Sequence, residues 1–326
     1  MKALTPRQAT LWLLGGTVFW GSSFPLMSIA TNGLATVSGV PAHDLAGQAL
    51  VGATINGWRY GAAAILMALL LLPQWRRTTR VEILGGTVLG SFVGMGMFLQ
   101  IVGLAWVVPS ISGMLTATPV ILAPLAQWLL LRRPVPRQVW WAALIAGVGC
   151  LVLTLGGDTA QVATSLIGPP PFPYAGECLT FLGALCFTGH IISVDTFGSR
   201  CDPGRLTGLL FIMVALVNGL IAWVVSGDRV AMMTHLPALL PQPSWLGAMA
   251  GLIVFSSIIA LWIMNRAQPS ITPARAAVLY TLEPVFALLF SLLLGQEGLT
   301  RWTLVGSALV IGGALWSIPR RARETR

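Results

Sequence analysis

Long apolar stretches, separated by short polar or basic segments, recur from one end of the chain to the other. Most of them reach the length of roughly 20 residues that an α-helix needs to cross a bilayer. The pattern predicts an all-α integral membrane protein. Its ten expected transmembrane helices are residues 9–30, 52–73, 82–107, 112–131, 139–155, 174–194, 206–225, 245–267, 272–297 and 302–318.

Three of these stretches contain a proline well inside them. Pro25, Pro119 and Pro284 lie in the first, fourth and ninth stretch. Because proline has no N–H, it removes one helical hydrogen bond, and each of these positions is a predicted hinge. Glu283 stands directly before Pro284, at the middle of the ninth stretch. Carboxylates at bilayer depth are rare and usually face a cavity or a partner, so Glu283 is the leading candidate for substrate binding or coupling.

Four other side chains at depth are candidates for the same site. Tyr280 lies one helical turn before Pro284, and Gln100, Trp20 and His190 lie in the third, first and sixth stretch. An amide, an imidazole and two aromatic rings with a polar edge are groups that can hold a polar small molecule in an apolar surrounding.

Each candidate also has a structural interpretation. Glu283 can be protonated and hydrogen-bonded to a neighbouring helix, His190 can be a packed residue, and Trp20 can face lipid. Arg59, in the second stretch, is assigned a structural charge, because a long basic side chain can reach the membrane interface from inside a helix.

Composition supports the membrane class. Hydrophobic residues make up 56% of the chain, charged residues make up 9%, and the mean hydropathy is +0.81. A soluble domain carries about 25% charged residues, so a soluble protein is excluded. The net charge of +9 therefore indicates orientation in the membrane and not a nucleic-acid partner. The four cysteines form no spaced framework, and we expect no disulfide, metal site or cofactor.

The basic residues also predict the topology. If the N-terminus is cytoplasmic, sixteen of the 19 basic residues fall in cytoplasmic segments of the ten-helix arrangement. A surplus of basic residues is typical of the cytoplasmic segments of membrane proteins. We therefore expect the protein in the cytoplasmic (inner) membrane of a cell, with both termini in the cytoplasm.

Internal similarity predicts two repeats. Pro119 and Pro284 are 165 positions apart, and so are the segments ALIAG (143–147) and ALVIG (308–312). Five helices in each half require the second half to enter the membrane from the opposite side, which is an inverted repeat. The expected boundaries are residues 1–155 for the first five-helix repeat, 156–173 for a periplasmic linker, 174–319 for the second repeat and 320–326 for a basic cytoplasmic tail.

Motifs of other functional classes are absent from the sequence. It has no HExxH, no GxSxG and no GxxxxGK[ST], and its three histidines are scattered. These absences argue against a membrane enzyme and against a nucleotide-driven pump. No predicted helix carries the row of charges that often forms the selectivity ring of a channel.

Four stretches resemble the EamA-domain branch of the drug/metabolite transporter superfamily: TVFWGSSFPLM (17–27), the helix that contains Arg59, LWIMNRAQPSITPARAAVLYTLEPVFALLFSLLLGQE (261–297) and LVGSALVIGGAL (304–315). The resemblance implies a ten-helix carrier whose first, third, fourth, sixth, eighth and ninth helices line a central cavity. It also implies transport of amino acids, related metabolites or drugs, usually outward.

The expected function is a secondary transporter that exports amino acids or related small metabolites by alternating access, through rocking of the two halves and bending at the three prolines. A multidrug efflux carrier for cationic or aromatic compounds is the alternative, followed by a membrane scaffold without transport. The expected partners are a small-molecule substrate and the lipid bilayer. Proton coupling versus facilitated diffusion, and monomer versus homodimer, are left open.

Overall fold

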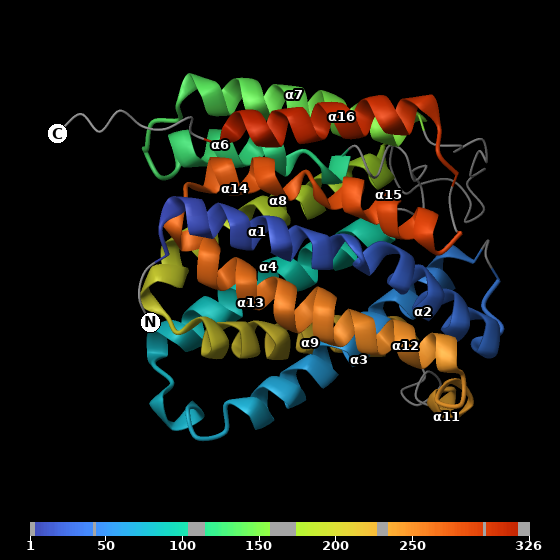
Figure 1. Cartoon of the computed structure of the whole chain (residues 1–326). Coiled ribbons are helices and arrows are strands. Elements are labelled where there is room, and N and C mark those ends of the chain that lie inside the picture. Colours follow the sequence, from blue (N-terminus) through green and yellow to red (C-terminus); the bar gives the residue numbers. More distant parts are fainter. Residues whose placement is uncertain are drawn as a thin grey trace.

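A computed structural model describes residues 4–41, 44–103, 115–156, 174–226, 234–295 and 298–318. All regular elements in these residues are helices (Figure 1). They are α1 (Pro6–Gly21), α2 (Ser23–Ser38), α3 (Leu45–Leu70), α4 (Arg80–Gly103), α6 (Pro119–Leu129), α7 (Arg137–Gly156), α8 (Ala175–Phe197), α9 (Pro203–Ser226), α11 (Leu236–Leu239), α12 (Pro243–Gly251), the π-helix η3 (Leu252–Ile259), α13 (Ala260–Ala267), α14 (Pro273–Tyr280), α15 (Glu283–Leu293) and α16 (Arg301–Ser317), with 3₁₀ turns η1 (Trp75–Arg77), η2 (Gly198–Arg200) and η4 (Gln268–Ser270).

The helices form a bundle with two distinct ends (Figure 1). The start of α1 and the end of α16 lie at one end, together with the turns η1, η2 and η4; we call this end the terminal side. The junction of α2 with α3 and the end of α15 lie at the opposite end, which we call the distal side.

Seven helical stretches among the described residues are long and apolar enough to cross a bilayer: 6–38, 80–103, 137–154, 175–200, 203–226, 243–270 and 273–293. Three further helices run beside them (Figure 1). Of these, α3 is 26 residues long but carries Asn56 and Arg59, while α16 has 17 residues and α6 has 11. These helices fit the predicted multi-pass membrane class.

Several predicted boundaries were wrong. The second helix begins at Leu45 and not near Gly52, because the Asp44 side chain accepts a hydrogen bond from the Gly47 amide and caps the helix there. The first, fourth and ninth predicted helices are each interrupted, at Ser22, at residues 117–118 and at residues 281–282, whereas the eighth continues from α12 through the π-helix η3 into α13. Residues 104–114, the predicted linker from 157 to 173 and the predicted basic tail lie outside the described residues.

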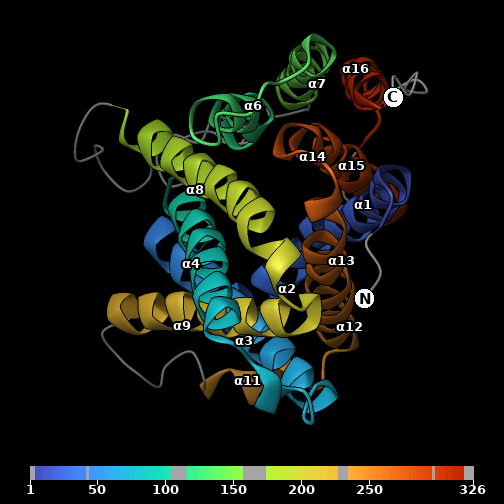
Figure 2. The same ribbon diagram turned by 90° about the vertical axis from the view of Figure 1, so that its left-hand side faces the viewer.

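Glycines let α4 pack closely between α8 and α9 (Figure 2). A Cβ atom at Gly90 would lie 2.6 Å from the Leu210 carbonyl oxygen of α9, and a Cβ at Gly94 would lie 3.0 Å from Val217 of the same helix. Gly96 faces Phe187 of α8 in the same way. Glycine at these positions permits the close approach of the three helices, because a side chain there would meet atoms of α8 or α9.

The closest helix pairs join the two halves of the chain. α4 contacts α8 and α9, α3 contacts α9, and α7 lies along α16 (Figures 1 and 2). The two similar segments, 143–147 and 308–312, lie on α7 and α16 and therefore belong to two helices packed against each other. The halves are interleaved and do not form two separate bodies.

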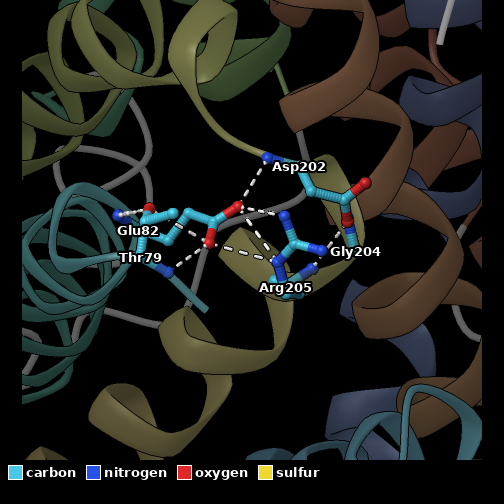
Figure 3. Close-up of polar contacts among 5 residues, drawn as sticks. All are labelled: Thr79, Glu82, Asp202, Gly204 and Arg205. Atoms are coloured by element: carbon cyan, nitrogen blue, oxygen red, sulfur yellow. Dashed lines mark hydrogen bonds and ion pairs between the residues drawn. The ribbon is translucent and has the colours of Figure 1, made fainter. Parts of the chain in front are cut away.

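An ion pair joins the starts of α4 and α9 on the terminal side (Figure 3). Glu82 is 1% exposed and its carboxylate accepts hydrogen bonds from the Arg205 guanidinium (2.7 Å), the Asp202 amide (2.9 Å) and the Thr79 amide (2.8 Å). The Thr79 hydroxyl accepts in return from the Glu82 amide, which completes a capping box at the start of α4. One buried carboxylate thus caps α4 and fixes α9 to it.

Replacing Glu82 by alanine is expected to lower the free energy of unfolding by roughly 3 kcal/mol, since it leaves Arg205 and two amides at a buried site without their acceptor. The change is measured by denaturant unfolding of the purified protein in detergent. Arg133→Ala is the control. Arg133 forms an ion pair with Asp195 (2.8 Å), but its side chain is 58% exposed. Such an exposed ion pair should contribute about 1 kcal/mol or less to the free energy of unfolding. Equal losses in the two variants would contradict the assignment of Glu82.

Candidate functional site

Three helices are broken near the middle of the bundle. The first break is at Ser22 between α1 and α2, the second is at residues 117–118 before α6, and the third is at Thr281 and Leu282 between α14 and α15. Each predicted hinge proline lies within the first three residues of the helix that follows a break: Pro25 in α2, Pro119 in α6 and Pro284 in α15. Proline is favoured there because the first turn of a helix has no internal partner for its N–H.

Hydroxyl groups provide hydrogen bonds at all three breaks. The hydroxyls of Ser22, Thr118 and Thr281 each donate to the carbonyl three residues earlier, at 2.7, 2.6 and 2.6 Å. At the second break the accepting carbonyl is that of Leu115. In an unbroken helix this carbonyl would accept a hydrogen bond from the amide of residue 119, but Pro119 has no N–H to donate. Unwound backbone inside a membrane protein needs such internal partners, because the surrounding lipid offers none.

The π-helix η3 places one serine at the first break and the next serine beside Arg59. In η3, Ser256 donates to the Phe19 carbonyl at the end of α1 (3.0 Å) and lies 3.1 Å from the Ser22 hydroxyl. Its neighbour Ser257 donates to the Leu252 carbonyl, five residues back, and accepts a hydrogen bond of 2.7 Å from the Arg59 Nε atom. Segments of π-helix are rare and occur frequently at functional sites. The pattern of apolar residues gave no sign of this one.

The three breaks surround a cavity of about 360 Å³. All five candidate binding residues line it: Trp20, Gln100, His190, Tyr280 and Glu283. Arg59, Pro119 and Pro284 line it as well, whereas Pro25 is buried and is not among the lining residues. The expected six helices all contribute to the lining, and so do α3 and α7, through residues such as Asn56 and Cys150. The lining residues come from the middle and distal parts of most of these helices.

An arginine and a glutamate face this cavity without forming an ion pair with each other. Arg59 is 3% exposed, and its Nη2 atom has no hydrogen-bond partner among the described residues. The Glu283 carboxylate likewise accepts no hydrogen bond and forms no ion pair within 4 Å in the described part of the chain. Arg59 therefore does not extend to the membrane interface as expected; it lies halfway along α3 at the cavity wall.

His190 adds a third polar group with a free atom. Its ring is 2% exposed, and its Nδ1 atom lies 3.3 Å from the Leu89 carbonyl of α4. In the neutral form that donates from Nδ1, the Nε2 atom is an acceptor, and it has no partner among the described residues. Gln100 is already engaged, since its amide donates to the Thr116 hydroxyl at 3.0 Å.

Aromatic rings form one wall of the cavity. Trp20 and Tyr280 meet edge to face, with ring centroids 5.8 Å apart. The Tyr280 hydroxyl does not point to Glu283; it donates to the Gln268 side-chain oxygen at 2.8 Å. Gln268 is fully buried in η4, and sequence reasoning missed it because a single amide in a turn after an apolar helix carries no recognisable signal.

The cavity thus presents a guanidinium, a carboxyl group and an imidazole to its interior. Comparisons with known proteins bear on the class of protein. A family model described as the EamA-like transporter family matches residues 7–155 and again 174–318. An uncharacterized transporter of Archaeoglobus fulgidus is 23% identical over 303 residues, which cover 93% of this chain and 83% of that protein.

One solved crystal structure shares the fold, with a TM-score of 0.67 at 17% sequence identity over 96% of this chain and 98% of its own. The matches point to a transporter and not to an enzyme. The family model covers nearly the whole chain in two segments, and the apolar helices are those of a multi-pass membrane protein. The predicted resemblance is therefore confirmed, and the chain belongs to the EamA-like transporter family.

Proposed function

We propose that the protein is a secondary transporter that exports amino acids or related zwitterionic metabolites across the cytoplasmic membrane by alternating access. One observation carries the proposal: the Arg59 Nη2 atom and the Glu283 carboxylate face the same cavity, and neither has a partner among the described residues. Buried charges are costly unless they are paired, so a ligand with a carboxylate and an ammonium group would stabilise both at once.

The cavity supports this substrate class in its size and lining. Its volume of about 360 Å³ is within the range of roughly 300–1,000 Å³ typical of small-molecule sites. The ligand carboxylate would accept hydrogen bonds from Arg59, and its ammonium group would donate to Glu283 and to the His190 Nε2 atom. Trp20, Phe24 and Phe187 would then surround its side chain, which favours apolar or aromatic amino acids.

Efflux of cationic drugs is the second candidate. Glu283 and the aromatic wall would suit a cation, but the charge of Arg59 at the same cavity would repel it. A scaffold without transport would give the free Arg59 nitrogen and the Glu283 carboxyl group at the cavity no role. The zwitterion accounts for both charges and is therefore preferred.

We further propose ten transmembrane helices arranged as two inverted repeats, with residues 156–173 as the periplasmic linker and both termini cytoplasmic. Two matches to one family model support two repeats, and α3, α6 and α16 would complete the ten with the seven apolar stretches. The terminal side is then cytoplasmic, and the cavity extends toward the periplasm.

The interleaved packing changes the expected motion. Rocking of two rigid halves would separate α4 from α9 and break the Glu82–Arg205 ion pair. We instead propose that helices of both halves, α3, α4, α8 and α9, form a fixed frame, and that alternating access comes from bending at the three breaks. Protons or the substrate gradient alone would drive the cycle.

The proposed membrane topology can be tested by cysteine labelling. Cysteines introduced in the loops 74–80 and 132–138 should resist a membrane-impermeant maleimide added to intact cells, because the basic residues of these loops hold them in the cytoplasm. They should react after the cells are permeabilised. A cysteine in the proposed periplasmic linker is the positive control, and labelling of either basic loop in intact cells would contradict ten spans.

The prolines are expected to matter for turnover more than for folding. Pro119→Ala and Pro284→Ala each supply an amide that closes a helical hydrogen bond, so the breaks become stiffer and transport slows, by roughly tenfold for a barrier raised by about 1.4 kcal/mol. Initial rates in proteoliposomes measure the effect. Pro124→Ala, within α6 and away from a break, serves as the control. Wild-type rates in both break variants would limit these prolines to a structural role.

Glu283→Gln should fold normally but reduce transport of tryptophan at least tenfold, since a neutral amide loses a charged hydrogen bond of about 1.5–3 kcal/mol. Arg59→Gln should shift preference from tryptophan toward tryptamine, which lacks the carboxylate. Uptake into proteoliposomes with both compounds measures each change. If Glu283 is only structural, the Gln variant keeps its rate while Glu283→Leu loses stability. A wild-type protein that carries tryptamine and rejects tryptophan would favour the cationic-drug alternative.

A further inference from the structure

One buried side chain connects the cavity wall to a turn on the terminal side of the bundle. Gln268 is 0% exposed and lies in η4, the turn between α13 and α14. Its amide nitrogen donates to the Ile191 carbonyl of α8 at 2.6 Å, and its oxygen accepts from the Tyr280 hydroxyl at 2.8 Å. The side chain thus holds together α8, η4 and the last residue of α14.

Both partners of Gln268 also belong to the cavity wall. Ile191 and Tyr280 line the cavity, and the Tyr280 ring packs against Trp20. Tyr280 directly precedes the break at Thr281, so bending of α14 against α15 must move its ring. A ligand that displaces the ring would change the distance between the hydroxyl and Gln268.

The packing of α8 and of the turn η2 that follows it continues from Ile191 toward the terminal side. Val194, one turn beyond Ile191 on α8, is 0% exposed. Gly198, one further turn on, approaches Pro269 so closely that a Cβ atom at this position would overlap the proline ring. These contacts lie between the cavity and the terminal side, and the hydrogen bonds of Gln268 connect them to the cavity wall.

We propose that Gln268 is a positioning residue that couples the cavity to closure of the terminal side. The Tyr280 hydroxyl holds the Gln268 side chain in the orientation in which its amide reaches Ile191, and loss of that hydrogen bond releases η4 from α8. The proposal rests on the proposed function, in which Tyr280 faces the substrate, and it adds the link between that site and the conformational change.

Accessibility of residue 194 tests the coupling without any substrate. Val194→Cys, in a background with the four native cysteines changed to alanine, reports whether α8 separates from the buried cluster around residue 194, which includes Met264 of α13, the helix that leads into η4. In purified protein, a maleimide should label this cysteine several-fold faster when Tyr280→Phe or Gln268→Leu is added, because each change breaks the contact. Labelling at the rate of the reporter protein in both variants would overturn the proposal.

The double variant Tyr280→Phe/Gln268→Leu separates coupling from simple stability. It removes both polar partners together, so no side chain of the pair remains buried and unpaired, and its melting temperature should return close to that of the reporter protein. Labelling should nevertheless stay fast. Slow labelling in the double variant would show that the pair only satisfies buried polar groups, and the proposal would fail.

Thr207→Val is the matched control. It removes a hydrogen bond of 2.9 Å that a second buried amide, Asn265, donates on the same side of the bundle, but it does not touch Tyr280. It should leave labelling of residue 194 unchanged, and labelling as fast as in Gln268→Leu would contradict a specific role for Gln268.

Hydrogen–deuterium exchange covers the case in which the cysteine-free background does not fold. With the native cysteines in place, Gln268→Leu and Tyr280→Phe should speed exchange in residues 191–200 and 265–272, and unchanged exchange would overturn the proposal. Since neither readout requires transport, a wild-type protein that transports no amino acid would refute the proposed function while these results still decide the role of Gln268.

Discussion

The structure depends on one constraint: backbone groups inside an apolar bundle must find partners within the protein. Three helices are broken near its middle, and at each break a serine or threonine hydroxyl takes over a carbonyl. The prolines that follow need no such partner, since they have no amide hydrogen. Broken helices of this kind are tolerated only where they line a cavity or are covered by protein, and here they surround one.

Around the breaks, small residues set the distances between helices. Glycines on α4 allow direct contact with the backbones of α8 and α9, and the Glu82–Arg205 ion pair fixes the same helices at the terminal side. Because these contacts cross between the two halves of the chain, they tie the proposed repeats into one frame. Movement is then most easily accommodated at the breaks, where few helical hydrogen bonds need to change.

The cavity combines this geometry with an unusual distribution of charge. Arg59 has one structural bond, to Ser257, and one free nitrogen, while Glu283 has a free carboxylate. The same π-helix that supplies Ser257 also supplies Ser256 to the first break. A local distortion of one helix therefore supports both the charged wall of the cavity and the break opposite it. Membership of the transporter family defines the class of function, and this arrangement of charges is what bears on the substrate.

The sequence by itself determined the membrane class, most of the helices, the family and five residues that share one cavity. Apolar length, proline and an acid at mid-helix are local properties, and they remain visible in one dimension. Only the tertiary structure decided that Arg59 and Glu283 line the same cavity, that η3 is a π-helix and that Gln268 joins Tyr280 to α8. These features depend on partners far apart in the chain: 198 positions separate Arg59 from Ser257, and 77 separate Gln268 from Ile191. Local composition contains no information about which distant backbone atom a buried amide will meet.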